Sequence, residues 1–299
     1  MSEPTGEEKP RTKEPGKRFE GPRVLLSMAA LVVLIVVGLC VPIAYTALTR
    51  TRVPVDQCVV VAEYPHDGTA FTQGLIYADL GGDVGPALFE SVGGWGKSKL
   101  RRVDIRTGRV LQESRMSDQV FAEGLALIGR RLYQLTWKSG IGYVYDARTF
   151  DRLGTFPLPR DERTGRRIEG WGLTTDGESL IVSDGSYKLY FLQPETFDLE
   201  KVVEVRDDRR PIVRLNELEF INQEVWANVW KATSIVRISP KSGVVQGYID
   251  CSGLEGGRQR FTDEDVMNGI AFDRKRQRIF VTGKLWPKLY EIRVVAKPE

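Results

Sequence analysis

Residues 121–127 read FAEGLAL, and this short stretch contains the pattern on which the fold depends. Glu123 stands directly before a glycine and a run of apolar residues that is typical of a β-strand. The arrangement recurs in FTQGLIY from Phe71, GWGLTTD from Gly170, LNELEFI from Leu215 and MNGIAFD from Met267. The apolar residues after the glycine position are 50, 48, 45 and 52 residues apart, at Leu75, Leu125, Leu173, Leu218 and Ile270. A period near 50 residues is typical of a β-propeller blade.

Each repeat continues with more short apolar runs separated by polar turns. The second runs are ALFES, LYQLTW, LIVSDGS, EVWANVW and IFVTGK, and a third follows each of them, as in GYVYDARTF and KLYEIRV. In the first repeat a fourth run, VLQESRM, follows the turn RTG. Runs rich in Val, Ile, Leu and aromatic residues between Gly, Asp and Ser turns indicate strands. We therefore expect an all-β fold, a five-bladed β-propeller with four strands in each blade.

The two ends of the repeat region predict how the ring closes. The last repeat ends near Val295 after three strands, whereas an unassigned strand, CVVVAEY at residues 58–64, precedes the first repeat. Pairing this strand into the last blade would complete four strands and cover exposed strand edges. The sequence thus predicts one closed domain over residues 57–299.

The N-terminal region predicts a membrane anchor. Residues 24–48 contain no charged residue over 25 positions, which is long enough for a membrane-spanning helix. Six Lys and Arg residues precede this stretch and only Arg50 and Arg52 follow it closely, which places the N-terminus in the cytoplasm. We expect a disordered tail at 1–22, a transmembrane signal-anchor at 23–49, a linker at 50–56 and a periplasmic domain. A cleaved signal peptide, giving a secreted protein, is the competing interpretation; a lipoprotein at Cys40 fits poorly with the bulky Leu39.

Composition excludes several classes of site. The net charge of +3 gives no reason to expect nucleic-acid binding. One histidine, His66, and three cysteines cannot form a multi-His or Cys/His zinc centre. We expect a protein without a metal or a cofactor, and we expect it to be a monomer. His66 itself is interpreted as a turn residue. Cys58 and Cys251 are the thiols of the exported part, where a disulfide between them is one hypothesis and two separate small apolar residues the other.

The repeat also places particular side chains at the centre of the ring. The first strand of each propeller blade lines the central channel, so the residue before the glycine position should converge from every blade; these residues are Gln73, Glu123, Trp171, Asn216 and Asn268. The ends of the second runs add Glu90, Trp95, Trp137, Asp184, Trp230, Lys284 and Trp286. Indole rings gathered around carboxylates and amides favour a pocket for a small molecule or a peptide end. A purely structural channel with trapped water is the alternative.

The motifs YPHDGTAFTQGLIY, FAEGLAL, LYQLTWK, IEGWGLTTDG, LNELEFI, MNGIAFD and VTGKLWPKLYEI together resemble the plant and bacterial type of glutaminyl-peptide cyclotransferase. The resemblance extends from about Cys58 to Val295. It implies a five-bladed propeller, unrelated to the zinc-dependent animal enzymes, that converts the N-terminal glutamine of a peptide into pyroglutamate with loss of ammonia.

The resemblance also implies roles for individual residues. Glu123 would be the proton shuttle, and Lys284 and Asn216 would be donors to the developing oxyanion. Gln73 and Asn268 would hold the substrate's amide or backbone groups. The walls would consist of Phe71, Phe121, Trp137, Trp171 and Trp230. Two other functions remain open: a non-catalytic propeller that binds a ligand or protein at the same rim, and a calcium-dependent, lactonase-like propeller with an ion among Glu90, Glu123, Asn216 and Asn268.

Overall fold

The structure is a computed structural model that describes residues 53–208, 210–254 and 264–297. The predicted tail 1–22, the predicted membrane helix 23–49 and the first three residues of the predicted linker 50–56 lie outside these ranges. Among the described residues, no helix has the length and apolar character needed to cross a membrane. The described part is all-β, as predicted.

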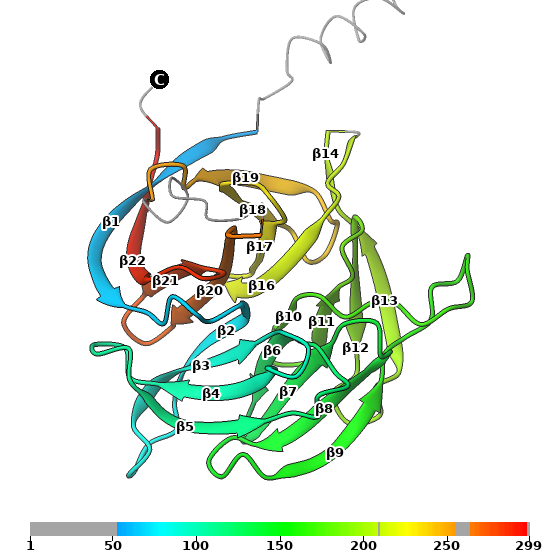
Figure 1. Cartoon of the computed structure of the whole chain (residues 1–299). Helices are drawn as coiled ribbons and strands as arrows, with labels where there is room; N and C mark the ends of the chain where they lie inside the picture. Colours follow the sequence, from blue (N-terminus) through cyan, green and yellow to red (C-terminus); the bar gives the residue numbers. More distant parts are fainter. Residues whose placement is uncertain (1–52, 209, 255–263, 298–299) are drawn as a thin grey trace, which may run out of the picture. The chain divides into compact units, whose positions relative to one another are not determined.

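The strands form five four-stranded units, which we call blades and number in chain order (Figure 1). Blade 1 consists of β2 (Thr72–Asp79), β3 (Pro86–Val92), β4 (Lys99–Val103) and β5 (Val110–Arg115), and blade 2 of β6 (Ala122–Ile128), β7 (Arg131–Thr136), β8 (Ile141–Asp146) and β9 (Arg152–Pro157). Blade 3 consists of β10 (Leu173–Thr175), β11 (Leu180–Ser183), β12 (Lys188–Leu192) and β13 (Leu199–Glu204), and blade 4 of β16 (Leu215–Ile221), β17 (Glu224–Val229), β18 (Ser234–Ile238) and β19 (Val245–Asp250). Blade 5 consists of β20 (Met267–Asp273), β21 (Arg278–Gly283), β22 (Lys288–Val295) and β1 (Val55–Pro65). A small hairpin of β14 (Arg206–Asp207) and β15 (Arg210–Pro211) connects blades 3 and 4.

The first repeat-derived strand of each blade is its innermost strand. β2, β6, β10, β16 and β20 contact one another in this order, and β20 contacts β2 again, so the inner strands form a closed ring. The residues before each glycine position therefore converge on one central axis, as the repeat predicted.

The last blade is completed by β1, the N-terminal strand, which forms the outermost strand of blade 5. It pairs antiparallel with β22 from Gln57 opposite Val295 to Pro65 opposite Lys288, which confirms the predicted closure. Its first residues also run parallel to β19, starting with Val55 opposite Tyr248. This second pairing was not predicted. It joins blades 4 and 5 into one eight-stranded sheet.

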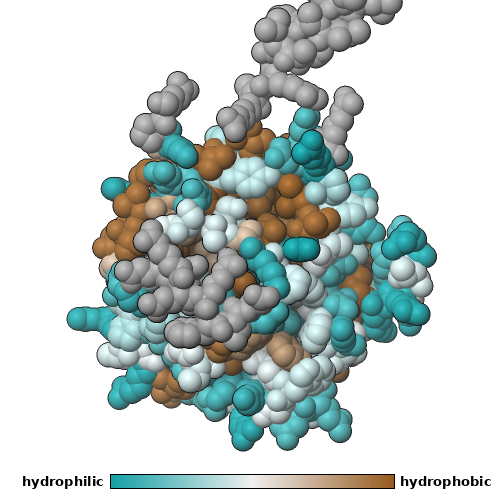
Figure 2. Space-filling view, turned by 45° about the horizontal axis from the view of Figure 1, so that its top comes forward, coloured by the Kyte–Doolittle hydropathy of each residue, from teal (hydrophilic) through white to brown (hydrophobic). Residues whose placement is uncertain are grey.

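An ion pair and a hydrogen bond fasten β1 on its two sides. Arg237 of blade 4 donates to Asp56 at 2.8 Å, and Arg278 of blade 5 donates to the Tyr64 hydroxyl at 3.0 Å. The strand still exposes apolar side chains, among them Val59 and Val61. On the face seen in Figure 2, hydrophobic surface gathers in the upper part, whereas hydrophilic side chains are frequent along the lower edge.

The glycine of the repeat is explained by the close approach of neighbouring inner strands. A Cβ added to Gly172 would lie 1.8 Å from the carbonyl oxygen of Asn216, and one added to Gly124 would lie 2.4 Å from the nitrogen of Leu173. Neither distance leaves room for a side chain, so these positions require glycine whatever their dihedral angles.

The fourth repeat has Glu217 in place of the glycine, and its carboxylate spans the centre of the ring. One oxygen accepts the backbone N–H of Leu75 at 3.2 Å and the other accepts the N–H of Ile270 at 2.9 Å. The side chain is fully buried, and burial raises its pKa well above the ordinary range. Glu217 thereby links blade 4 to blades 1 and 5 and satisfies two buried amides.

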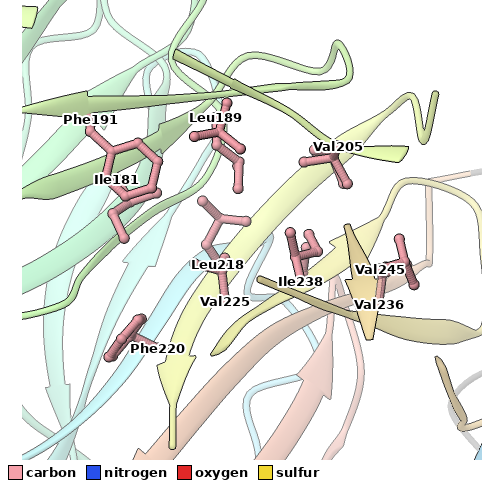
Figure 3. Packing of buried hydrophobic residues seen from close by; sticks show 13 residues of the cluster. Ile181, Leu189, Phe191, Val205, Leu218, Phe220, Val225, Val236, Ile238 and Val245 are labelled. Carbon is pink, nitrogen blue, oxygen red and sulfur yellow. The ribbon is translucent and has the colours of Figure 1, made fainter. Parts of the chain in front are cut away.

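Apolar side chains fill the spaces between blades. Figure 3 shows such a cluster, in which Ile181 and Phe191 of blade 3 face Leu218 and Val225 of blade 4. Truncating a buried Leu or Ile to alanine costs about 2–5 kcal/mol, so a row of such clusters makes the blades a rigid frame for the inner strands.

Candidate active site

The site begins with a β-bulge that is repeated around the ring. The pairing of the inner strand with its neighbour shifts between Thr72 and Gly74 in blade 1 and between Ala122 and Leu125 in blade 2. The same shift occurs in blades 4 and 5. A bulge bends its strand and redirects a side chain. The residue before each glycine position, such as Gln73 or Glu123, therefore lies where the regular pairing is interrupted.

These positions border a cavity of about 380 Å³ at one end of the ring, within the range of small-molecule sites. It lies where the inner strands begin and the antiparallel second strands end. Its lining residues are Phe71, Gln73, Phe121, Glu123, Trp137, Trp171, Asn216, Trp230, Glu264 and Lys284. The structure thus brings together nine of the ten predicted site residues.

Glu123 lies in the wall of the cavity and is only 5 % exposed. Its Oε1 accepts a hydrogen bond from Nε2 of Gln73 at 2.8 Å. Burial raises the pKa of the Glu123 carboxyl well above its ordinary value of 4.5; the positive charge of Lys284 opposes this rise and the carboxylate of Glu169 adds to it. A carboxyl group with increased proton affinity is suited to proton transfer near neutral pH.

Asn268 lies behind Gln73 and does not line the cavity. Its Nδ2 donates to Oε1 of Gln73 at 3.2 Å and to the carbonyl oxygen of Thr72 at 2.9 Å. This arrangement leaves the Gln73 amide nitrogen to face Glu123. The expected contact of Asn268 with substrate is therefore corrected: the bulged turn of β20 places Asn268 where it orients Gln73.

Lys284 follows β21 and is 4 % exposed. Its Nζ lies 4.6 Å from the ring centroid of Phe71, a cation–π contact. Burial lowers the pKa of Lys284, while the carboxylates of Glu123 and Glu264 oppose this change. Its ammonium group makes no ion pair with any residue of the described ranges and borders the cavity, so it can donate to a molecule bound there.

Asn216, at the start of β16, is 2 % exposed and borders the same cavity. Its side-chain oxygen is buried and lacks a hydrogen-bond partner within the part of the chain that the structure describes. Because this oxygen is enclosed by protein atoms, the amide nitrogen is the side-chain atom of Asn216 that a molecule in the cavity can contact. Asn216 therefore offers a hydrogen-bond donor to the cavity.

Aromatic rings form two walls of the cavity. On one side Phe121 contacts Phe71 edge-on at 6.0 Å between centroids and Trp137 at 5.6 Å. On the other side Trp171 and Trp230 contact each other at 6.0 Å with perpendicular ring planes. Edge-to-face contacts of this kind fix the relative orientation of rings.

Glu169 is a residue that the sequence interpretation missed. Its Oε2 accepts the indole N–H groups of both Trp137, at 2.7 Å, and Trp171, at 3.1 Å. One carboxylate thus ties the two aromatic walls together. The only signal in the sequence was an acidic residue two positions before Trp171. Glu264, the tenth lining residue, precedes β20 and lies outside the repeated pattern.

Several predicted rim residues lie elsewhere. Glu90 is buried with His66 and Arg101, whose charges outweigh the effect of burial and lower its pKa to about 2. His66 combines this contact with the expected backbone partner, the Trp286 carbonyl oxygen, at 2.6 Å. Trp286 belongs to the apolar core that blades 4 and 5 share, together with Trp226 of blade 4. Asp184 accepts hydrogen bonds from the hydroxyl groups of Ser186 and Tyr190. Neither the ionic contacts nor the core packing could be deduced from strand ends alone.

Cys58 and Cys251 are free thiols in the structure, so the suggested disulfide is not formed in it. The thiol of Cys251 nevertheless interacts with that of Cys58 and lowers its pKa. The parallel pairing of β1 with β19 in blade 4 brings the two cysteines together, because Gln57 lies opposite Asp250 and each cysteine is the next residue.

Comparison with known proteins gives consistent results. The sequence model of the family described as glutamine cyclotransferase matches residues 31–294. A glutaminyl-peptide cyclotransferase of Arabidopsis thaliana is 47% identical over 242 residues, which cover 80% of this chain and 72% of that protein. The crystal structure of a glutaminyl cyclase from Myxococcus xanthus is similar with a TM-score of 0.74 and 36% identity, covering 82% of this chain and 99% of that chain.

Proposed function

The chain belongs to the glutamine cyclotransferase family, and from this premise we propose that it converts the N-terminal glutamine of peptides into pyroglutamate with Glu123 as the proton carrier. The observation that supports this role is the position of Glu123, which is buried in the wall of an aromatic cavity beside Lys284 and hydrogen-bonded to Gln73. The assignments below are proposals of the same kind.

The cavity first selects the folded conformation of the substrate. The α-amine must approach the δ-carbon of its own side chain, and a chain held in that conformation reacts with a large effective concentration. The rings of Phe121, Trp137 and Trp171 would enclose the methylene groups and exclude water. Asn216, which borders the cavity, would donate an amide N–H to the side-chain carbonyl oxygen of the glutamine.

Proton transfer then runs through Glu123. The carboxylate takes a proton from the α-ammonium, and the freed lone pair attacks the amide carbon while the carbonyl π electrons move to oxygen. Glu123 returns the proton to the amide nitrogen, the C–N bond breaks as the C=O bond re-forms, and ammonia leaves. The ring nitrogen gives its second proton to Glu123, which releases it to ammonia. A carboxyl with a raised pKa is matched to an α-ammonium, whose ordinary pKa is about 8.

Lys284 stabilises the oxyanion of the tetrahedral intermediate. Its ammonium group lies in a low-dielectric wall without an ion-pair partner in the described ranges, where a positive charge acts strongly on developing negative charge. Loss of one such donor typically lowers kcat by about 10²–10³-fold. Lys284 and Asn216 would then be the two donors to the oxyanion that the sequence led us to expect.

Ammonia release from Gln-Gly by the full-length chain tests the proposal, with Glu123→Gln as the matched variant. Release by the wild type and loss in the variant are expected. Equal rates in both proteins would contradict the role of Glu123, and an inactive wild type would favour a non-catalytic binding propeller. Because the proposed steps use only side chains of the cavity, we expect EDTA to leave the rate unchanged.

We also propose that the protein is a single-pass membrane protein whose catalytic domain lies in the periplasm and acts as a monomer. The uncharged residues 24–48 and the basic residues before them support the anchor and its orientation. The completeness of the cavity within one chain supports the monomer. Protease treatment of intact and permeabilised cells tests the orientation, and sedimentation tests the monomer.

A further inference from the structure

A second hollow of about 660 Å³ adjoins the active-site cavity on blade 1. The two share Phe71 and Phe121 as lining residues, so this edge-on ring pair separates them. Given the function proposed above, we propose that this hollow, the blade 1 groove, binds residues two to four of the substrate peptide and favours acidic side chains there. Nothing in the cyclisation chemistry itself requires such a preference.

The geometry of the reaction requires the rest of the bound peptide to extend out of the cavity. The α-amine and the side chain of the N-terminal glutamine must both lie against Glu123, so the carbonyl end points outward. An extended chain advances about 3.3–3.6 Å per residue, and three residues therefore reach about 10 Å beyond the cavity. The groove begins at the cavity wall and is large enough to hold several residues.

The charges of the groove are unbalanced. Its lining includes the basic residues Lys97, Lys99, Arg101 and Arg115 and the acidic residues Asp67 and Glu113. Lys99 pairs with Glu113 at 2.9 Å, and Arg101 pairs with Asp67 at 2.7 Å. Lys97 and Arg115 make no ion pair within the described ranges. A carboxylate in the groove would therefore meet two uncompensated positive charges, whereas a lysine side chain would be repelled.

The groove is fixed in shape by the loop between β3 and β4. The Ser98 hydroxyl donates to the Gly94 carbonyl oxygen at 2.8 Å and accepts the N–H of Ala122 at 2.9 Å, which fastens the loop to the inner strand of blade 2. Arg115 donates to the Gly96 carbonyl oxygen at 3.2 Å and is held at the same loop. A preformed groove loses little entropy on binding and is suited to recognition.

Trp95 lies beside Phe121, one of the two rings that separate the cavity from the groove. It is 53 % exposed, and its ring lies 5.8 Å from that of Phe121 and 6.4 Å from that of Trp137. Gly94 and Gly96, on either side of it, both line the groove. An exposed indole at this point offers an apolar contact to the second residue of the peptide and a fluorescent reporter of binding.

The test compares Gln-Gly with tetrapeptide amides that carry Glu or Lys at position two, three or four. We expect kcat/KM to be at least about threefold higher for the Glu peptide than for the Lys peptide at the best position, and the ratio to shrink as salt screens the charges. Lys97→Glu, alone and together with Arg115→Glu, should reverse the preference. Arg106→Glu, an exposed charge in the turn at the far end of β4, should keep it. The amide of Gln-Gly, which carries no carboxylate and does not extend into the groove, should react alike in all variants.

A binding measurement separates this proposal from the catalytic one. The dissociation constants of pyroglutamyl peptides with Glu or Lys at the same positions, followed by tryptophan fluorescence, report on the groove without any turnover. Tighter binding of the Glu peptides in wild type and loss of that preference in Lys97→Glu would support the groove even if Gln-Gly did not react. Equal affinities at all three positions, or a preference that Lys97→Glu leaves intact, would overturn it.

Discussion

Replacing Glu123 with glutamine should inactivate the protein and stabilise it at the same time. The replacement has nearly the same shape, and its Oε1 can still accept the hydrogen bond from Gln73. It removes the ionisable group and nothing else in the cavity wall. General acid–base catalysis contributes about 10²–10⁴-fold, so we expect kcat to fall by that factor. KM should change little because the aromatic walls are intact.

The gain in stability follows from the burial of the carboxyl group. A raised pKa in the folded state means that ionising Glu123 is costly there but not in the unfolded chain. Each pH unit between 4.5 and the pH of the experiment costs about 1.4 kcal/mol until the folded-state pKa is reached, which gives a ceiling of about 3.5 kcal/mol at pH 7. The difference in free energy of unfolding between variant and wild type is therefore larger at neutral pH than in acid. It vanishes below pH 4.5, where Glu123 is protonated in both the folded and the unfolded state.

Urea unfolding of wild type and Glu123→Gln at pH 4 and pH 7 measures this difference. Ammonia release from Gln-Gly measures activity in the same preparations. A variant that is less stable than wild type at pH 7 would show that the carboxylate is held by favourable contacts, contrary to its burial. A variant that retains more than about one tenth of the wild-type kcat would refute Glu123 as the proton carrier.

Three further predictions concern the frame of the site. Glu169→Gln should move the acidic limb of the pH profile of kcat/KM to lower pH, because the charge of Glu169 helps to raise the pKa of Glu123, whereas the exposed control Glu162→Gln should leave the limb in place. Glu169→Ala also loses both indole hydrogen bonds and should lower kcat/KM roughly a further tenfold. Gly172→Ala should destabilise the fold by roughly 3 kcal/mol or more in urea unfolding, because its Cβ would meet a backbone oxygen. The control Gly154→Ala has open space around it and should change the free energy of unfolding by less than about 1 kcal/mol. Equal effects of the two substitutions would contradict the packing argument. Glu90→Gln should destabilise the fold by about 3 kcal/mol, because it removes one of the two carboxylates that pair with buried Arg101 and leaves Asp67 as the other. The stabilisation that wild-type Glu90 supplies is present above pH 4.5 and is lost as pH falls towards 2, which circular dichroism of acid unfolding would follow.

The repeat determined much of the fold in advance because a propeller blade is a local unit. Strand, turn and glycine recur in each copy, so their alignment places Gln73 and Glu123 at equivalent positions without any knowledge of distant contacts. The closing strand could be predicted for a related reason, since an incomplete last blade and an unassigned first strand complete each other.

What could not be predicted depends on contacts between repeats. The hydrogen bonds of Glu169 to two indoles and the span of Glu217 across the axis join residues from different blades, and single-copy patterns carry no trace of them. The same holds for Asn268, whose repeat position is equivalent to that of Glu123 although it lies behind Gln73. Trp286 lies just after a strand end but packs into the apolar core between blades 4 and 5, a contact that the sequence of one repeat does not determine.

Closure of the ring by β1 also determines when the domain can be completed during biosynthesis. Roughly 220 residues separate Pro65 from its partner Lys288, and at about 5–20 residues per second a ribosome needs on the order of 10–40 s to supply them. Throughout that interval the first strand to be made has no antiparallel neighbour, although it carries Val59 and Val61. The exposed apolar residues of β1 must therefore be kept from other chains until β22 has been made. Loss of β22 would also leave β1 without its antiparallel partner.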